Sequence, residues 1–229
     1  MPISLQDCQE TIAWVENIAS TIDKDIIPAL ARGSSEGGYY SGIRLIFCYV
    51  DFFGELYKNT TQSNGPVNFI KVYFGKVNPR YNDIAGILYS TFRHGTVHTF
   101  QPKLFLINGK PYGYVISKED TNGNFIYKAD GYVECTYTHL EPQSPNPGIQ
   151  LFPISLERLL KDLKSAVDYY ISELKNNEKL RENAFDMMRK IQTPTEFRCD
   201  NNLVKEKHPN LKRGEEPRSY IDKAELSKF

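Results

Sequence analysis

The sequence predicts a mainly helical α+β domain, in which a helical bundle carries an inserted antiparallel β-meander and ends in a long C-terminal helix. Apolar residues recur at intervals of three and four over most of residues 4–99, which is the periodicity of amphipathic helices. From residue 103 the pattern changes to short runs rich in Tyr, Val, Ile and Phe, separated by Asn-Gly and Asp-Gly pairs. Helical spacing of leucines resumes at Leu156.

The first two helices are predicted by their apolar stripes. Residues 4–32 read as one long amphipathic helix with Ser4 as its N-cap, and a Gly- and Ser-rich loop at residues 33–38 ends it. A second helix is predicted over residues 39–58, with a stripe that contains Ile43, Phe47, Val50 and Tyr57.

Two further helices are predicted before residue 103. Pro66 suits the first position of a third, short helix, which Asn78-Pro79 ends. A fourth helix is predicted over residues 81–99, and Gln101-Pro102 breaks it. Its C-terminal half contains the run Arg93-His94-Gly95-Thr96-Val97-His98.

Four short strands follow, at residues 103–107, 112–117, 124–128 and 132–138. The Asn-Gly and Asp-Gly pairs between them favour tight hairpins, because both residue types tolerate a positive φ. We therefore expect an antiparallel meander inserted into the helical domain at about residues 103–140. A proline-rich linker at residues 142–148 is predicted to follow it.

The last predicted helix begins after Ser155, a good N-cap, and its stripe weakens at Asn176-Asn177 before it resumes as far as Ile191. Beyond Pro194 the chain is polar and lacks periodicity. The expected organisation is a helical domain at residues 1–193 and a polar tail with weak intrinsic structure at residues 194–229.

The bulk composition indicates a globular protein whose core needs neither disulfides nor a structural metal. The chain has 229 residues, 40% of them apolar and 24% charged. Its 28 basic and 28 acidic residues balance, which excludes nucleic-acid binding through a broad basic surface but allows a small cleft with a few cations. Four scattered cysteines without a Cys-x-x-Cys pair indicate a reducing, cytoplasmic setting. No signal-peptide layout or apolar stretch of ~18 residues occurs, so no membrane span is expected.

The run from Arg93 to His98 concentrates residue types suited to catalysis on RNA. When the 2′-hydroxyl of RNA attacks the adjacent phosphate, a group must transfer a proton near neutral pH, and histidine does so. A cation must also stabilise the charge on the phosphorus centre, and arginine does so with a planar fork of donors. On a regular α-helix, Arg93 and His98 lie about 140° apart. Two copies of the chain across a twofold axis are therefore expected to build the site together.

The run resembles the R-x4-6-H motif of the HEPN superfamily (higher eukaryotes and prokaryotes nucleotide-binding), and Leu88–Phe92 resembles the apolar turn that leads into its Arg. The resemblance covers about residues 1–102 and the helix from residue 155, and it leaves residues 103–140 as an addition. It implies an all-α bundle core, a homodimer with a shared cleft, and metal-independent endoribonuclease activity without a cofactor. It also implies RNA as the partner and a setting in stress response or defence.

The resemblance assigns phosphate binding to Arg93, proton transfer to His98, and orientation of Arg93 to His94. Some small HEPN toxins carry a tyrosine two residues after the histidine, where this chain has Phe100, and this difference argues against that toxin–antitoxin subgroup. A regulatory or antitoxin partner stays open. The family also includes non-catalytic members, so a non-catalytic RNA- or partner-binding module is the alternative function.

The run from Arg93 to His98 is open to three other interpretations. Arg93 and His98 are also typical of side chains that cap the last carbonyls of a helix. The Arg-His-Gly tripeptide matches the histidine-phosphatase signature, but that family places it directly after a first buried strand near the N-terminus. His94 and His98 have the i, i+4 spacing of a zinc-binding pair, but no third ligand is evident and no metal site is expected.

Overall fold

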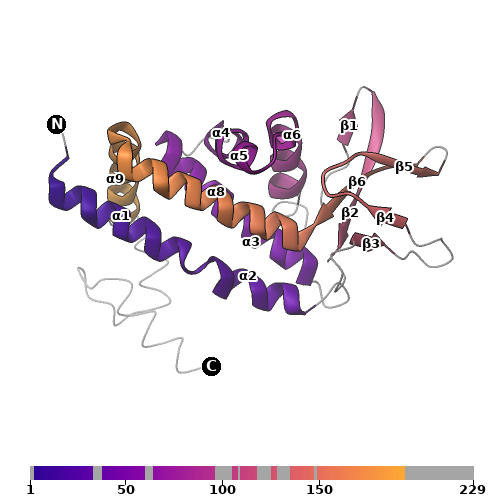
Figure 1. The fold of residues 1–229 in the computed structure, drawn as a ribbon, viewed down its shortest axis with the longest axis horizontal. Coiled ribbons are helices and arrows are strands. Elements are labelled where there is room, and N and C mark those ends of the chain that lie inside the picture. The colour runs from indigo at the N-terminus through magenta and orange to yellow at the C-terminus, as the bar shows by residue number, and fades with distance from the viewer. Residues whose placement is uncertain are drawn as a thin grey trace, which may run out of the picture. The chain divides into compact units, whose positions relative to one another are not determined.

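The computed structural model of the protein describes residues 3–32, 38–59, 64–95, 105–107, 109–117, 125–127, 135–146 and 149–193. These residues form several helices and a smaller β region (Figure 1), so the predicted mainly helical α+β class is confirmed. Nearly all of them belong to the unit Met1–Ile191. The predicted tail belongs to the second unit, Gln192–Phe229, and lies outside the described residues. None of the described helices is long and apolar enough to cross a membrane.

The N-terminal segment forms two helices, α1 (Leu5–Ala19) and α2 (Ile22–Ala31), so the prediction of one uninterrupted helix was wrong. Ser4 is the N-cap as predicted, because its hydroxyl accepts a hydrogen bond from the Asp7 amide at 3.1 Å. The break has a local cause. The Ser20 and Thr21 hydroxyls donate to carbonyls three residues earlier, at 2.7 and 2.9 Å, and so compete with continuation of the helix.

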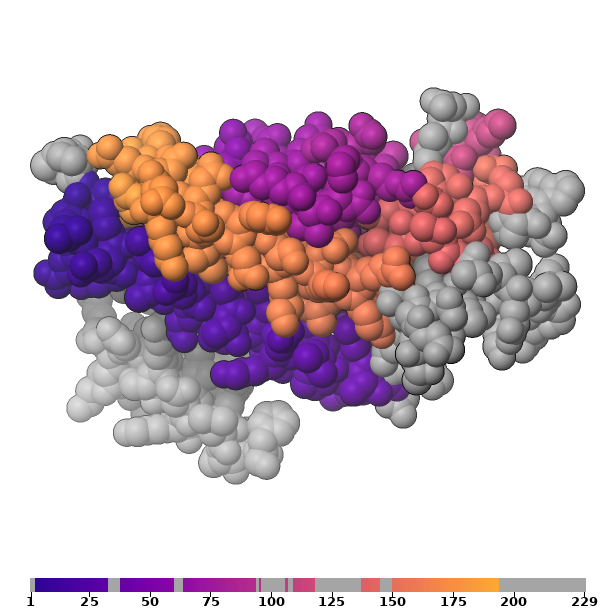
Figure 2. Space-filling model, in the orientation of Figure 1, coloured from indigo at the N-terminus to yellow at the C-terminus, as the bar shows by residue number. Residues whose placement is uncertain are grey.

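The buried core surrounds α3 (Gly38–Lys58), which confirms the second predicted helix. The other helical elements are α4 (Asn64–Phe69), the π-helix η1 (Ile70–Phe74), α5 (Gly75–Val77), α6 (Arg80–Leu88), the π-helix η2 (Tyr89–His94), α8 (Leu156–Asn176) and α9 (Glu178–Gln192). The predicted C-terminal helix is confirmed with its N-cap Ser155, and it divides into α8 and α9 at Asn177, where its pattern weakens. In Figure 2, α8 and α9 form a band between α1–α2 and α4–α6.

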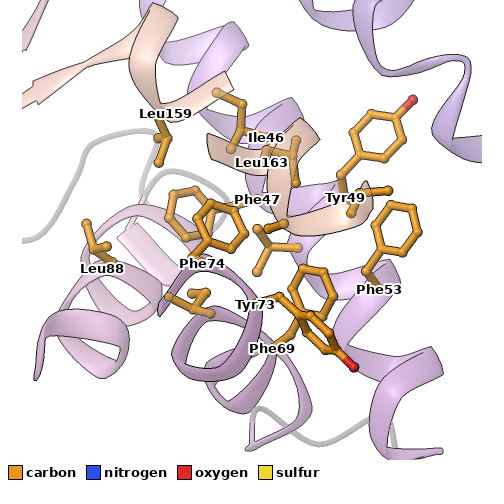
Figure 3. Close-up of a cluster of buried hydrophobic side chains, with 14 of the residues drawn as sticks. Ile46, Phe47, Tyr49, Phe53, Phe69, Tyr73, Phe74, Leu88, Leu159 and Leu163 are labelled. Carbon is orange, nitrogen blue, oxygen red and sulfur yellow. The ribbon is translucent and has the colours of Figure 1, made fainter. Parts of the chain in front are cut away.

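Aromatic side chains fill the space between α3, α4, η1 and α8 (Figure 3). Phe53, Phe69, Tyr73 and Tyr170 are fully buried. Their ring centroids lie 5.0 to 5.9 Å apart in several tilted, stacked and edge-to-face pairs. Such pairs are worth about 0.5–1.5 kcal/mol each beyond the burial of their area. Packing of this kind fixes how α3 sits against its neighbours.

A close approach of backbones joins α3 to α4 at Gly54. A Cβ added at Gly54 would lie 2.4 Å from both the Cα and the N of Pro66. Pro66 is buried at the start of α4, so the clash would be with backbone rather than with a side chain that can rotate away. Only glycine fits this position of α3.

The strands are β1 (Phe105–Ile107), β2 (Lys110–Ser117), β3 (Phe125–Tyr127), β4 (Cys135–Tyr137), β5 (Gln143–Asn146) and β6 (Ile149–Ser155). Two predicted antiparallel pairs, β1 with β2 and β3 with β4, are confirmed. The prediction of one continuous four-stranded meander was wrong. The main sheet has the order β1-β2-β6-β5, and β2 pairs in parallel with β6, whereas β3 and β4 form a separate two-stranded sheet.

The pairing of β6 has a physical reason. Successive residues Phe152, Pro153, Ile154 and Ser155 are all buried, which is typical of a parallel strand covered on both faces rather than of a linker. The predicted proline-rich linker contains the edge strand β5. Pro145 lacks an N–H to donate to a ladder, and the edge of a sheet tolerates that loss.

A buried group of polar side chains, which we call the His139 clasp, connects the β region to the helices. Nδ1 of His139 accepts a hydrogen bond from the Ser155 amide at 2.9 Å, where β6 runs into α8. The Tyr81 hydroxyl of α6 lies 3.3 Å from Nε2 of His139 and donates to the Asp162 carboxylate of α8 at 2.7 Å. Because Nδ1 accepts a hydrogen bond, it carries no hydrogen, and the neutral imidazole has its hydrogen on Nε2. The Asp162 carboxylate lies 3.9 Å from Nε2, and with a neutral imidazole this contact is not an ion pair.

We predict that Gly54→Ala destabilises the protein by about 1–3 kcal/mol, the usual cost of overpacking a core. Gly86→Ala is the matched control, because a Cβ at this helical glycine meets nothing within 4 Å. The control is expected to gain up to about 1 kcal/mol from helix propensity. Urea unfolding followed by circular dichroism measures both changes. Equal stability of the two variants would contradict the close approach at Pro66.

The His139 clasp predicts a pH dependence of stability. Burial, and then the positive charge of Arg158, lower the pKa of His139 to about 3. The imidazole of the unfolded chain titrates near about pH 6.5, so the unfolded state binds more protons between about pH 6.5 and 3. Stability is therefore lost as the pH falls through this window, by up to about 1.4 kcal/mol per unit.

His139→Gln cannot titrate and serves as the reference for that pH dependence. The wild type should be the more stable protein near neutral pH. Its advantage over the variant should shrink as the pH falls from about 6.5 towards 4. Denaturant unfolding of both proteins at several pH values measures the difference, and a difference independent of pH would refute a neutral buried imidazole.

Candidate functional site

The structure describes only part of the predicted catalytic run. Arg93 and His94 lie in η2, which directly follows α6. The side chain of His94 is outside the described part of the chain, and so are His98 and Phe100. The described part of the site therefore consists of Arg93 and the residues around it.

The helix that carries Arg93 is not a regular α-helix. The prediction of an α-helix over residues 81–99 holds for α6, but Tyr89–His94 is π-helical, with hydrogen bonds between residues five apart. No Gly or Pro within Tyr89–His94 marks this change in the sequence. The angle of about 140° between Arg93 and His98 applies to a regular α-helix, and it stays a prediction because His98 lies outside the described residues. Short π-helical turns are frequent at functional sites.

Arg93 is held by an acidic residue of α3. Its Nε donates to Oδ2 of Asp51 in an ion pair, and the Tyr89 hydroxyl donates to Oδ1 of the same carboxylate at 2.7 Å. The side chains of Arg93 and Asp51 are 26% and 18% exposed. A charge-assisted hydrogen bond in such a partly buried setting is stronger than one on an open surface.

The pKa values around Arg93 follow from this pairing. Burial lowers the pKa of Arg93, but the hydrogen bond and the charge of Asp51 outweigh it, and the net pKa is raised. Burial, the hydrogen bond to Asp51 and its charge raise the pKa of Tyr89, so the phenol stays protonated as a donor. The cluster therefore contains a permanent cation, its carboxylate and a neutral phenol.

Two more side chains of α3 lie on the same face as Asp51. Cys48 and Glu55 stand at spacings of three and four from it. Burial and then the charge of Asp51 raise the pKa of both groups, while Arg93 partly opposes the shift. A raised thiol pKa makes Cys48 a poor nucleophile at neutral pH. We call Cys48, Asp51 and Glu55 the α3 polar stripe.

The guanidinium of Arg93 has further N–H donors with which it can bind an anion. A guanidinium offers five N–H donors, and Asp51 engages the one on Nε. Neither Nη1 nor Nη2 of Arg93 has a hydrogen-bond partner among the described residues. These two nitrogens can form paired hydrogen bonds to the non-bridging oxygens of a phosphate. The described residues contain no group of three or more His, Cys, Asp or Glu that could hold a metal ion.

Sequence reasoning found Arg93 and missed Asp51 and Tyr89. A signal for Asp51 did exist, because it is an acidic residue in the apolar segment Phe47–Phe53. An acid in such a position is buried in part and needs a cation or donors. The sequence does not say which of the basic residues supplies the partner.

A groove of about 570 Å³ lies elsewhere, along the seam between α2 and α8 that Figure 2 shows. Its apolar floor includes Ile27, Leu30 and Leu160, and charged residues such as Asp23 and Lys164 form its rim. Arg93 does not line it. The groove and the cluster around Arg93 are thus separate features.

Comparison with known proteins returned no family model, no curated protein and no solved structure that matches this chain.

We predict that Tyr89 and Asp51 are energetically coupled. In a double-mutant cycle of Tyr89→Phe and Asp51→Asn, the coupling should be about 1–2 kcal/mol, as for a hydrogen bond to a charged acceptor. Chemical unfolding measures each corner of the cycle. The control cycle pairs Tyr89→Phe with Asp23→Asn, whose carboxylate contacts Lys164, and should be additive within about 0.5 kcal/mol. Additivity in both cycles would refute the contact.

Proposed function

We propose that the protein is a HEPN-like, metal-independent endoribonuclease that cleaves RNA by attack of the 2′-hydroxyl. The observation that carries the proposal is the state of Arg93, the first residue of the R-x4-H run. Its guanidinium is fixed through Nε by Asp51, and Nη1 and Nη2 have no hydrogen-bond partner within the part of the chain that the structure describes. A preorganised cation is what stabilisation of a phosphoryl transition state requires.

The proposed reaction needs two functions besides substrate binding. The 2′-oxygen bonds to phosphorus as its proton leaves, the bond from phosphorus to the 5′-oxygen breaks, and that oxygen gains a proton. The products are a 2′,3′-cyclic phosphate and a free 5′-hydroxyl. His98 is assigned the proton transfer, and Arg93 stabilises the charge on the non-bridging oxygens. Asp51 and Tyr89 hold Arg93, a task that the resemblance gives to His94.

The proposed assembly is a homodimer with a cleft shared by two copies of Arg93 and His98. The free thiols Cys8 and Cys48 support a reducing, cytoplasmic setting. Light scattering on the purified chain tests the dimer directly.

We predict that the pure protein cleaves RNA in the presence of EDTA and leaves cyclic phosphate ends. His98→Ala should lower the rate by about 10²–10⁴-fold through loss of proton transfer. Arg93→Ala should lower it by at least about 10²-fold through loss of charge stabilisation. Gel analysis of end-labelled single-stranded and structured RNAs measures the products, and Lys164→Ala is a surface control that should match the wild type.

Two results would overturn this function. Cleavage that persists in both variants would point to a contaminating nuclease. RNA binding without cleavage, unaffected by either substitution, would instead indicate the non-catalytic RNA-binding module.

A further inference from the structure

We propose that Asp51 is the residue that positions Arg93 in the site, and that Tyr89 holds Asp51 in place. Asp51 thereby restricts Arg93 to binding a phosphate end-on, which means through Nη1 and Nη2. This assignment rests on the proposed function for its role in cleavage. The positioning itself is a property of the protein without RNA.

Both carboxylate oxygens of Asp51 accept hydrogen bonds. Oδ1 accepts from the Tyr89 hydroxyl at 2.7 Å, and Oδ2 accepts from Nε of Arg93. A carboxylate held at both oxygens has its orientation fixed. Asp51 belongs to the core helix α3, whose neighbours Val50 and Phe53 are fully buried, so its backbone is also fixed.

The geometry of the guanidinium determines how Arg93 can bind a phosphate. A planar guanidinium can bind an oxyanion side-on, through Nε and one Nη, or end-on, through both Nη nitrogens. Asp51 occupies Nε and thereby blocks the side-on edge. The end-on edge, which no described residue engages, is the one left for a substrate. Arg93 is thus limited to one approach, which fixes the phosphate relative to the helix that carries the motif.

The charges around Arg93 indicate what Asp51 contributes. Asp51 places a negative charge beside the proposed phosphate position, and Glu55 on the same face of α3 adds an acidic group. These acids do not favour binding of RNA, so the benefit of Asp51 lies in orientation. Its loss is therefore expected to lower kcat while KM stays the same or falls.

The cleavage experiment compares Asp51→Ala and Asp51→Asn with Glu55→Gln. Asp51→Ala should lower kcat by about 10- to 100-fold, the scale of a small misplacement, without raising KM. Asp51→Asn keeps a carbonyl that can accept from Nε and should recover part of kcat. Glu55→Gln removes a charge on the same stripe and leaves the hydrogen bond between Asp51 and Arg93 intact, so it should lower KM without loss of kcat. A rise in KM for Asp51→Ala, or an equal loss of kcat in Glu55→Gln, would overturn the assignment.

A measurement without RNA separates this inference from the proposed function. In ¹H–¹⁵N NMR spectra, the Nε–H of Arg93 should give a resonance protected from solvent exchange. The resonance should persist in Asp51→Asn and vanish in Asp51→Ala, while circular dichroism verifies that both variants fold. An Arg93 resonance that is unprotected in the wild type, or unchanged in Asp51→Ala, refutes the positioning role. If the wild type cleaves no RNA but the NMR result holds, the nuclease proposal fails and the positioning stands.

Discussion

The burial of α3 is the constraint on which the rest of the structure depends. The helix packs against α2, α4 and α8, and its aromatic face fills the core between them. Gly54 brings α4 so close that no side chain fits between the two backbones. Because three sides of α3 are covered, the one polar stripe that remains, with Asp51 at its centre, must be satisfied by the element that covers the fourth side.

That element is η2, and the partial burial of Asp51 explains why a cation lies there. A carboxylate removed from water without partners costs several kcal/mol, and paired hydrogen bonds offset most of that cost. Arg93 and Tyr89 supply the two donors from one turn of η2. The same contact that satisfies the core helix thus fixes the side chain on which the proposed function rests. Packing and site are linked by one ion pair.

The sequence predicted what local periodicity determines. The stripes of α3 and α8, the caps at Ser4 and Ser155, and the two antiparallel strand pairs all follow from residues close together in the chain. The break at Ser20-Thr21 was missed because hydroxyls are compatible with a helix until they bond to its own carbonyls.

Features that join distant residues escaped prediction. The parallel pairing of β2 with β6 connects segments more than thirty residues apart, and the hairpin signals between them favoured local pairing instead. The same holds for the site. Arg93 stands out by its motif, whereas Asp51 precedes it by 42 positions and is recognisable only as an unpaired acid in an apolar stripe. Nothing in the composition of Tyr89–His94 distinguishes a π-helical turn from an α-helical one.

The ion pair also bears on the proposed dimer. Two guanidinium groups that converge on one cleft repel each other, by about 1 kcal/mol at 4 Å in water and by more in a less polar interface. In this chain each Arg93 is paired with its own Asp51, which offsets the positive charge of the guanidinium in the absence of RNA. Under the proposed function, a phosphate would complete the hydrogen bonding of Nη1 and Nη2 without displacing Asp51, because it would use the edge that the carboxylate leaves open. In the proposed dimer, Asp51 would therefore let two copies of the motif approach each other while each Arg93 keeps the donors that a phosphate needs.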